Sequence, residues 1–352
     1  MLSQKVFDFS IPVKVHFEVG GAKKIGSAIK AVGGSNVLIV TDKGVAGAGL
    51  HQVITSSLEK EGLSYSVFDK IEANPSTETV EKGHALFKEK GCDVVVGIGG
   101  GSPIDAAKAI ALLTANPLPL AQYEGPDKVP NPVAPIFAVP TTAGTGSEIN
   151  GSTVLTDRAR KYKMSIRSSH LVPELALLDP ALLCSLPPIV VAPTGMDALV
   201  HAIEAYVSVI SSPATDGLAI EAIRLVGQNL RAFYASPDSL EAASNMLMAS
   251  AMACMSFSNA RLGVIHAIAH VLGGRYNIAH GVACAVLLPH AMEYSLIGAA
   301  EKFGRIAVAL GEPTKGLTKM QKAKTSVEAV KKLMNDIDMP LGLAELGTKE
   351  ED

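Results

Sequence analysis

Up to about residue 185, short β-branched runs alternate with helix-length amphipathic segments, and this alternation restricts the fold more than any other feature of the chain. Strand, helix, strand at this interval implies right-handed crossovers and a mainly parallel sheet. The runs are apolar throughout, as expected of strands that are covered on both faces. The expected strands are 37–40, 65–68, 93–98 and 135–139. The helices expected between them cover 48–60 and 77–90, and a third begins at Pro103. Residues 13–19 alternate apolar with polar side chains instead, which predicts an edge strand with one wet face.

The second half of the chain is predicted to be helical. From residue 186 onward, Ala, Leu, Met and Ile recur three and four residues apart in the segments 198–209, 214–230, 240–255 and 262–272. A length of 352 residues suits two domains. We therefore predict an α/β domain over 1–186 and a helical domain over 187–352, with the boundary at the proline-rich stretch near residue 187.

The composition excludes several classes of protein. The chain carries 31 Lys and Arg against 34 Asp and Glu, a net charge of −3, with 48% hydrophobic residues and a mean hydropathy of +0.28. These values exclude intrinsic disorder and argue against a non-specific nucleic-acid binder. No apolar run reaches the length of about 18 residues typical of a membrane span, and residues 1–10 lack an apolar signal core. We therefore expect a cytoplasmic protein with no membrane partner, and reduced, packed thiols at Cys92, Cys184, Cys254 and Cys284.

Three consecutive glycines follow the apolar strand 93–98. Gly99, Gly100 and Gly101 precede Ser102 and Pro103, which suit the N-cap and the first position of a helix. Glycines let the backbone approach an anion closely, and the N–H groups of the following helix complete a phosphate site. A tight turn without a ligand is the alternative, because the register Gly-x-Gly-x-x-Ser over 97–102 meets the dinucleotide fingerprint only in part.

Two other predicted strands also end in polar residues. Residues 140–148 place Thr141, Thr142 and Thr145 after the strand 135–139, at the edge where open α/β sheets bind ligands. Asp42, after the strand 37–40, is suited to accept a hydrogen bond from a ribose 2′-hydroxyl and to repel a 2′-phosphate. Ordinary loop and turn chemistry explains both segments equally well.

Histidines concentrate in the predicted helical domain, where five of the nine lie between residues 201 and 290. Asp197 and His201 are four residues apart and so share one helical face, and His266 and His270 repeat this spacing on a helix that Gly273-Gly274 is expected to end. A buried carboxylate beside several imidazoles is costly unless a divalent cation compensates, and this donor set suits Fe²⁺, Zn²⁺, Mn²⁺ or Co²⁺. The alternative is a set of histidines that form ordinary hydrogen bonds in the core.

In order and spacing, four segments resemble the iron-dependent (group III) alcohol dehydrogenases: residues 99–105, 140–145, 195–204 and 266–281. The resemblance implies a Rossmann-like, mainly parallel sheet domain followed by an all-helical domain, as in dehydroquinate synthase. It implies hydride transfer between NAD and a small alcohol, diol or aldehyde, in a homodimer or higher homo-oligomer. Members of that family continue with another helical segment beyond the residues corresponding to 349–352, so we expect bare apolar surface on the helical domain.

The same resemblance implies roles for individual residues. The metal, Fe²⁺ foremost, is expected at Asp197, His201, His266 and His280, while His270 lies near the nicotinamide and relays a proton. Asp42 is expected to select NAD over NADP. The remaining expected cofactor contacts are Asn74, Gly99, Gly100, Gly101, Ser102, Thr141, Thr142, Thr145, Val154 and Lys163.

Two other functions remain open at this point. A lyase or cyclase similar to dehydroquinate synthase would use NAD within one catalytic cycle and would need cations for a substrate phosphate. Basic residues do cluster over 158–167, but we expect them to flank a solvated β-hairpin around Thr156-Asp157, with Lys163 alone reaching the cofactor. A metal- or nucleotide-binding protein without catalysis is the third alternative.

Overall fold

A computed structural model describes residues 6–276, 278–346 and 348, and these form two compact units. The sheet unit consists of residues 11–142 and 146–183. The helical unit contains the described residues from 184 onward together with 6–10 and 143–145. Residues 349–352, where we expected the chain to stop short of a further helical segment, lie outside the described residues.

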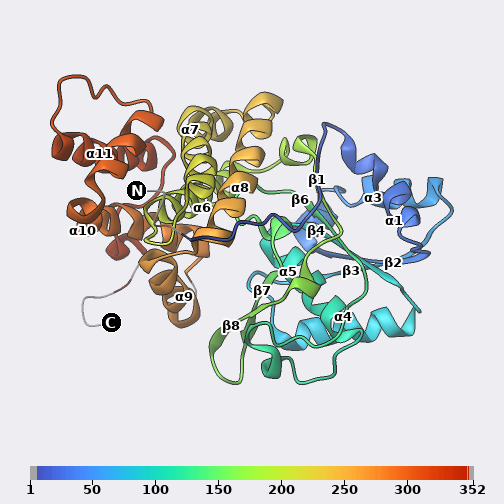
Figure 1. The fold of residues 1–352 in the computed structure, drawn as a ribbon. Coiled ribbons are helices and arrows are strands. Elements are labelled where there is room, and N and C mark those ends of the chain that lie inside the picture. The colour runs from blue at the N-terminus through green and yellow to red at the C-terminus, as the bar shows by residue number, and fades with distance from the viewer. Residues whose placement is uncertain (1–5, 277, 347, 349–352) are drawn as a thin grey trace. The chain divides into compact units, whose positions relative to one another are not determined.

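The sheet unit contains a six-stranded sheet in the order β1-β9-β6-β4-β2-β3 (Figure 1). Every neighbouring pair is parallel, which confirms the predicted fold class and the crossover connections. The strands are β1 (Val15–Phe17), β2 (Asn36–Asp42), β3 (Ser64–Ile71), β4 (Val94–Gly99), β6 (Ile136–Pro140) and β9 (Leu175–Leu178). β4 and β6 are buried at every position, whereas β1 is the predicted edge strand.

Helices connect these strands and cover the sheet. They are α1 (Ile25–Ala31), α2 (Lys43–Gly47), α3 (Gln52–Lys60), α4 (Thr77–Glu89) and α5 (Gly101–Leu113). Short 3-10 turns add Gly21–Lys24, Leu120–Tyr123, Ser147–Ile149, Ser169–Leu171 and Pro180–Leu183 to this unit. α5 packs against β2, β4 and β6, and it is buried from Pro103 to Leu113. This burial includes Lys108, whose ammonium group donates to the carbonyls of Ser147 and Ser152 and so fixes the helix in place.

Two predicted helix starts are wrong. The helix expected over 48–60 begins only at Gln52, because Gly49 adopts φ +72°, which glycine tolerates, in the turn between α2 and α3. α5 begins at Gly101 with Gly100 as its N-cap, so Ser102 and Pro103 lie inside the first turn. The Ser102 hydroxyl therefore does not cap its own helix, and instead accepts a hydrogen bond from the Asn74 N–H at 3.3 Å.

A second, three-stranded sheet has the order β5-β8-β7, with strands β5 (Gly125–Pro126), β7 (Ser152–Asp157) and β8 (Tyr162–Arg167). β7 and β8 are antiparallel and form the predicted hairpin. Two of its basic side chains are already paired: Arg158 with Glu72 at 3.0 Å, and Arg160 with both Asp157 and Glu124.

The helical unit contains α6 (Pro188–Val207), α7 (Pro213–Ala235), α8 (Leu240–Ala260), α9 (Val264–Tyr276), α10 (His280–Ala309), α11 (Lys319–Asp336) and a 3-10 turn (Leu343–Leu346). The four predicted helical segments are confirmed. One predicted end is wrong, because α9 continues through Gly273 and Gly274 to Tyr276. Glycine inside a helix costs about 1 kcal/mol relative to alanine, and burial of Leu272 and Gly273 offsets that cost.

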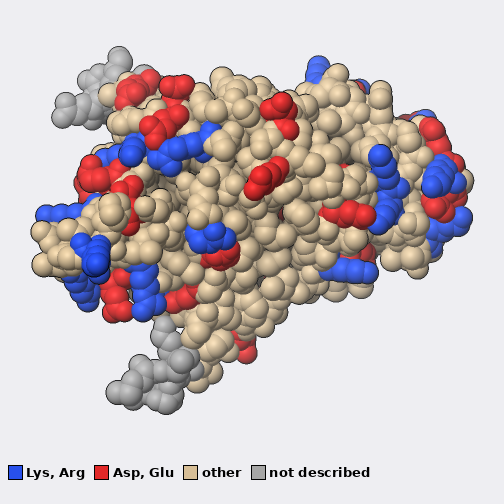
Figure 2. Space-filling model, turned by 90° about the horizontal axis from the view of Figure 1, so that it is seen from above, with Lys and Arg blue, Asp and Glu red and all other residues tan. Residues whose placement is uncertain are grey.

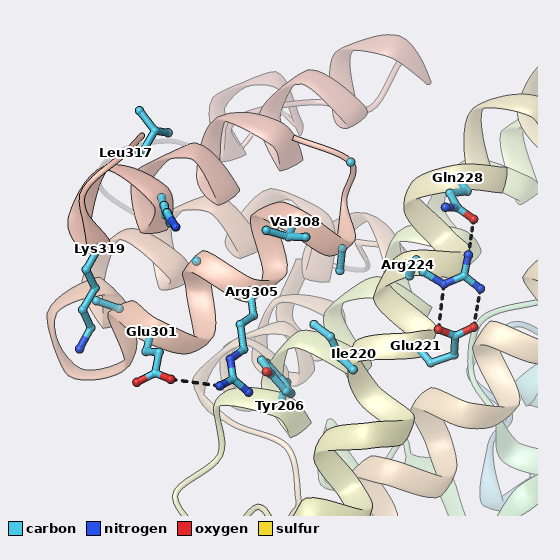
Figure 3. Close-up of a pocket in the computed structure, with 15 residues that line it drawn as sticks. Tyr206, Ile220, Glu221, Arg224, Gln228, Glu301, Arg305, Val308, Leu317 and Lys319 are labelled. Carbon is cyan, nitrogen blue, oxygen red and sulfur yellow. Dashed lines mark hydrogen bonds and ion pairs between the residues drawn. The ribbon is translucent and has the colours of Figure 1, made fainter. Parts of the chain in front are cut away.

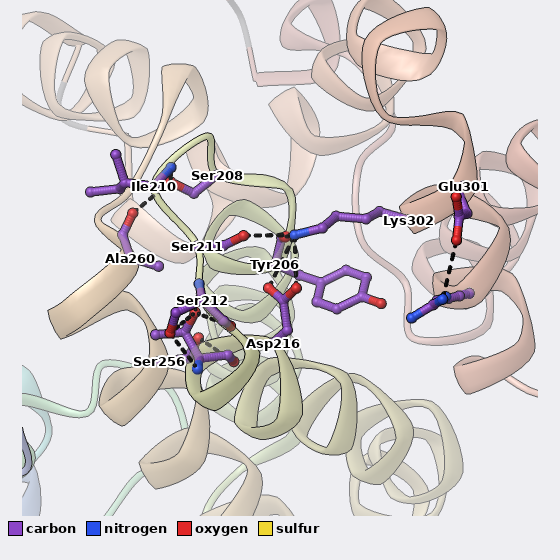
Figure 4. A network of polar contacts seen from close by, with 12 residues as sticks. Tyr206, Ser208, Ile210, Ser211, Ser212, Asp216, Ser256, Ala260, Glu301 and Lys302 are labelled. Carbon is purple, nitrogen blue, oxygen red and sulfur yellow. Dashed lines mark hydrogen bonds and ion pairs between the residues drawn. The ribbon is translucent and has the colours of Figure 1, made fainter. Parts of the chain in front are cut away.

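Lys302 of α10 ties together the end of α6 and the start of α7 (Figure 4). Its ammonium group donates to the Tyr206 carbonyl, to Ser211 Oγ at 2.7 Å and to Asp216 Oδ1 at 3.0 Å. It also lies 4.8 Å from the centroid of the Tyr206 ring. The ammonium group of this one lysine therefore fixes the connection between α6 and α7 to α10.

Charged side chains of both signs are interspersed on the face shown in Figure 2. Among the described residues, α10 alone is long and apolar enough to cross a membrane, by a test of length and composition that core helices of soluble proteins also pass. This helix packs against α6, α9 and α11.

Candidate functional site

Three helices of the helical unit carry the residues predicted to bind metal. Asp197 and His201 lie one turn apart on α6, His266 lies on α9, and His280 is the first residue of α10. Asp197, His201 and His266 are nearly completely buried, with exposed fractions of 2–4%. The structure thus brings together side chains that are more than 80 residues apart in the sequence.

The carboxylate of Asp197 lies at the centre of this group. Its Oδ1 is 3.8 Å from His201 Nε2, 3.7 Å from His266 Nε2 and 3.8 Å from His280 Nε2. These distances are too long for hydrogen bonds, and Oδ1 is buried without a hydrogen-bond partner among the described residues. Donors bound at about 2.1 Å to a tetrahedral ion are separated by about 3.4 Å, so the observed spacing is close to that of a ligand set. The residues present therefore fit a divalent cation.

Two of the imidazoles are held by hydrogen bonds from their other ring nitrogen. His266 Nδ1 lies 2.7 Å from Glu204 Oε2, and His201 Nδ1 lies 3.2 Å from the carbonyl of Gly144. Glu204 is itself buried and accepts a second hydrogen bond from the Ile265 N–H at 2.7 Å. If the Nδ1 atoms carry the protons, each Nε2 lone pair is directed toward Asp197, as metal-binding histidines require.

Burial and mutual proximity shift the pKa values of these groups strongly. Burial raises the pKa of Asp197, but the imidazoles of His201, His266 and His280 lower it more, so the carboxylate stays ionised. Burial lowers the pKa of His201 to about 4 and that of His280 to about 3. Both imidazoles are therefore neutral at pH 7 and keep the lone pairs that a metal needs.

Sequence reasoning missed two residues of this cluster. Glu204 ends the segment 195–204, on which the resemblance rests in part, but no role was expected of it. It lies seven residues after Asp197 and so shares its helical face. Cys284 was assigned to the packed thiols, yet its Sγ lies 3.9 Å from His266 Nε2 and 3.7 Å from His280 Nε2. Its spacing of four residues from His280 was the available signal.

His270, the predicted proton relay, lies beside the cluster. Its ring centroid is 5.4 Å from that of His280 and 6.3 Å from that of His266. His270 is half-buried, in contrast to the almost fully buried His201 and His266. It therefore combines access to solvent with proximity to the two imidazoles.

The predicted phosphate loop and several predicted cofactor residues are neighbours in the sheet unit. The Lys163 ammonium donates to Asn74 Oδ1 at 2.8 Å, and the Asn74 N–H donates to Ser102 Oγ. A Cβ built on Gly100 would lie 3.4 Å from Thr142 Oγ1, so this threonine is adjacent to the loop. These five residues surround the N-terminus of α5, whose N-cap offers no side-chain hydrogen bond.

The backbone of the loop explains its glycines. Gly99 adopts φ +148°, and a Cβ there would lie 2.6 Å from the ring of Pro103. The Gly99 carbonyl accepts a hydrogen bond from the Thr141 N–H at 2.9 Å, which connects the ends of β4 and β6. Gly101 starts α5, so its N–H belongs to the first turn, where N–H groups remain available to an anion.

The other predicted cofactor residues have different local roles. The Asp42 carboxylate caps α2 by accepting from the Val45 N–H at 2.9 Å, which is the ordinary turn role left open above. The Val154 N–H donates to Asp105 Oδ2 at 2.9 Å. Thr145 belongs to the helical unit rather than to the sheet unit.

The helical unit also contains two pockets. The larger, of about 820 Å³, lies between α7, α10 and α11 and includes none of the clustered histidines (Figure 3). Two ion pairs line this pocket: Arg224 pairs with Glu221, and Arg305 pairs with Glu301. The smaller pocket, of about 270 Å³, is lined by Glu204 and by apolar residues that include Ile203, Met292 and Phe303.

Comparison with known protein families assigns both halves of the chain. A family model described as iron-containing alcohol dehydrogenase matches residues 12–180, and a model of the C-terminal part of the Fe-containing alcohol dehydrogenase family matches residues 191–352. The chain belongs to the iron-containing alcohol dehydrogenase family. The resemblance expected from the four sequence segments is thereby confirmed.

Individual relatives of this family agree with the assignment. The chain is 42% identical to the 1,3-propanediol dehydrogenase of Citrobacter freundii, over 100% of this chain and 91% of the relative. It is 39% identical to the NAD-dependent methanol dehydrogenase of Bacillus methanolicus, over 98% of this chain and 91% of the relative. A crystal structure of 1,3-propanediol oxidoreductase superposes with a TM-score of 0.96 at 41% identity, covering 99% of this chain and 91% of that one. This iron-containing alcohol dehydrogenase family member is thus an enzyme with the fold class expected from its sequence.

Proposed function

We propose that this chain is a metal-dependent, NAD(H)-linked dehydrogenase that oxidises a small alcohol or diol and reduces the corresponding aldehyde. The observation that carries the proposal is the approach of three imidazole Nε2 atoms to within 3.8 Å of one buried carboxylate oxygen that has no hydrogen-bond partner in the described part of the chain. The names of relatives, 1,3-propanediol dehydrogenase and NAD-dependent methanol dehydrogenase, support the substrate class and the cofactor.

In the proposed site, Asp197, His201, His266 and His280 hold the cation, with Fe²⁺ favoured by the family and Zn²⁺ the main competitor. A bound cation would lower the pKa of the substrate hydroxyl, and NAD⁺ would accept the hydride. Glu204 and the Gly144 carbonyl would accept from the Nδ1 positions of His266 and His201 and would direct their Nε2 atoms to the cation. Although burial lowers the pKa of His266, its contacts with Asp197, Cys284 and Glu204 raise it well above its ordinary value, so a bound cation would have to displace a proton from this imidazole.

His270 is proposed to remove the proton that leaves the substrate hydroxyl. An imidazole titrates near working pH, and His270 is half-buried and adjacent to the ring of His280. In the reverse direction the same residue would deliver a proton to the product oxygen. It is a base and acid for the substrate, not a further ligand.

For the cofactor, we propose that Gly99, Gly100, Gly101 and Ser102 bind the pyrophosphate at the N-terminus of α5. The support for this assignment is that helix geometry leaves the first N–H groups of α5 without intrahelical partners and that its N-cap, Gly100, has no side chain to bond them. The other proposed contacts are Asn74, Thr141, Thr142, Thr145, Val154 and Lys163, with Asp42 favouring NAD over NADP through the carboxylate oxygen that does not cap α2. The domain division at 186/187, a cytoplasmic location and a homodimer or higher homo-oligomer belong to the same proposal.

The alternative, a lyase or cyclase similar to dehydroquinate synthase, needs free cations for a substrate phosphate. Arg158 and Arg160, which had suggested such a site, are instead occupied by carboxylates of the sheet unit. The family assignment and the relatives likewise favour the dehydrogenase.

The test is anaerobic loading with Fe²⁺ or Zn²⁺ followed by an NADH absorbance screen of short alcohols, diols and aldehydes. Metal content is measured in parallel for Asp197→Ala, His280→Ala and the control His290→Ala, which changes an exposed histidine on the same helix as His280. We expect the first two variants to lose both metal and turnover, and His290→Ala to keep both. Full metal content in Asp197→Ala would remove this carboxylate from the site, and absence of turnover in loaded wild type would contradict the dehydrogenase.

A further inference from the structure

We propose that Cys284 is a fifth donor to the cation and that its sulfur shifts the preference of the site from Fe²⁺ toward thiophilic cations such as Zn²⁺. The inference rests on the proposed function, because it requires the metal site formed by Asp197 and the histidines. It adds a donor of a different chemical kind to that site.

Geometry places Cys284 within the donor set. One donor atom each from Asp197, His266, His280 and Cys284 lies within 4.8 Å of all the others. The distances from Sγ to His280 Nε2 and His266 Nε2, 3.7 and 3.9 Å, match the separations of 3.7–3.8 Å between Asp197 Oδ1 and the imidazoles. The sulfur is therefore as close to His266 and His280 as the Asp197 carboxylate is, whereas His201 lies outside this group of four mutually close donors.

The position of Cys284 on α10 explains this orientation. It follows His280 by one turn, so the two side chains project from the same face of the helix. The residue is completely buried, and its neighbours Ala283 and Ala285 are small apolar side chains. An alanine at position 284 would be enough for packing. The thiol of Cys284 instead faces two imidazoles and a carboxylate.

The chemistry of sulfur supplies the proposed consequence. Thiolate ligands favour Zn²⁺ and other soft cations, whereas a set of one carboxylate and three imidazoles also suits Fe²⁺. A coordinating thiol is deprotonated by the cation, and its proton passes to solvent. Zinc–sulfur bonds of about 2.3 Å are only slightly longer than zinc–nitrogen bonds of about 2.0–2.1 Å, so both donor types can reach one ion.

The test uses Co²⁺, whose thiolate complexes show a ligand-to-metal charge-transfer band in the near ultraviolet. The metal-free full-length protein is titrated with Co²⁺ as wild type, Cys284→Ser, Cys284→Ala and Cys254→Ser. Cys254 is the matched control, because it is also fully buried on a helix of the same unit but contacts the hydroxyl of Ser258 rather than the histidines. Circular dichroism and thermal unfolding confirm that each variant is folded.

We expect the band in wild type and Cys254→Ser and its loss in both Cys284 variants. In anaerobic competition, the ratio of bound Zn²⁺ to bound Fe²⁺ should fall at least about tenfold in Cys284→Ser. Cobalt binding by wild type without the band, or an unchanged band and metal ratio in Cys284→Ser, would overturn the role of Cys284 alone. Wild type that binds none of the three cations would instead overturn the metal site of the proposed function, and this inference with it.

Discussion

Gly281 lies at the point where two metal-site helices touch, and replacing it with alanine should disturb the site without changing any ligand. It follows His280 at the start of α10, and its Cα faces the backbone of α6. A Cβ at this position would lie 2.3 Å from the carbonyl oxygen of Pro193 and 2.8 Å from its carbonyl carbon. Pro193 precedes Asp197 by one turn on α6. Because the clashing atoms are backbone, no rotamer change can relieve the overlap.

The size of the effect follows from this distance. Ordinary contacts of a Cβ begin at 3.4 Å, so α6 and α10 must separate locally by about 1 Å. Overpacking of this kind costs about 1–3 kcal/mol of the free energy of unfolding. The shift also exceeds the tolerance of about 0.5 Å for a functional constellation, and a misplacement of 1 Å can lower turnover by about 100-fold. Gly281→Ala should therefore lose stability, metal affinity and turnover together.

The assay combines urea unfolding of the metal-free protein, metal titration and NADH production from the best alcohol of the screen. The control is Gly217→Ala on α7, an exposed helical position where a Cβ would meet nothing within 4 Å. That variant should keep wild-type metal affinity and gain up to about 1 kcal/mol from its higher helix propensity. If Gly281→Ala matched wild type in all three measurements, the two helices would not be held at the separation argued here.

Three further predictions concern residues that support the fold or the site. Glu204→Ala should weaken metal binding about 10- to 100-fold in a metal titration, and Glu204→Gln, which keeps an acceptor for His266, should weaken it less; equal losses would contradict the positioning role. Lys302→Met should cost about 1–3 kcal/mol in urea unfolding, because Asp216 loses its partner; an unchanged midpoint would show that the contact contributes nothing. Burial raises the pKa of Glu148 to about 7 from an ordinary value of 4.5. The contribution of this carboxyl group to the free energy of unfolding is therefore fully present below about pH 4.5 and is lost as the pH rises through 7. Unfolding free energies of Glu148→Gln and wild type should thus diverge with pH in favour of the variant by about 3 kcal/mol, and parallel profiles from pH 4.5 to 8 would refute this.

The sequence was informative about the fold because burial leaves a direct pattern. Strands such as β4, covered on both faces, are continuous apolar runs, and the helices of the second half show spacings of three and four residues. The wrong helix boundaries arose where a single residue has more than one allowed role. Ser102 suits an N-cap, but Gly100 takes that position, and the serine hydroxyl is used by Asn74, 28 residues earlier in the chain.

The metal cluster was predictable only in part. The spacing of Asp197 and His201 fixed their common face on one helix, but the approach of α9 and α10 to that face depends on tertiary packing, which no local pattern encodes. Cys284 was missed for a related reason. A buried thiol in apolar sequence is ordinarily a small hydrophobic residue, and only the position of its neighbours in space distinguishes it from Cys254.

The donor set also links site formation to the stability of the helical unit. Asp197 carries a buried charge, and its Oδ1 has no hydrogen bond among the described residues, so the neighbouring imidazoles compensate this charge in the metal-free unit. A cation that binds the native state alone stabilises it by about 4 kcal/mol at 1,000 times its dissociation constant. Because the donors come from α6, α9 and α10, that stabilisation acts as a crosslink among three helices. The Lys302 contacts and the Gly281 packing restrict two of these helices, α6 and α10, without a metal, and they therefore reduce the ordering that the cation must impose when it binds.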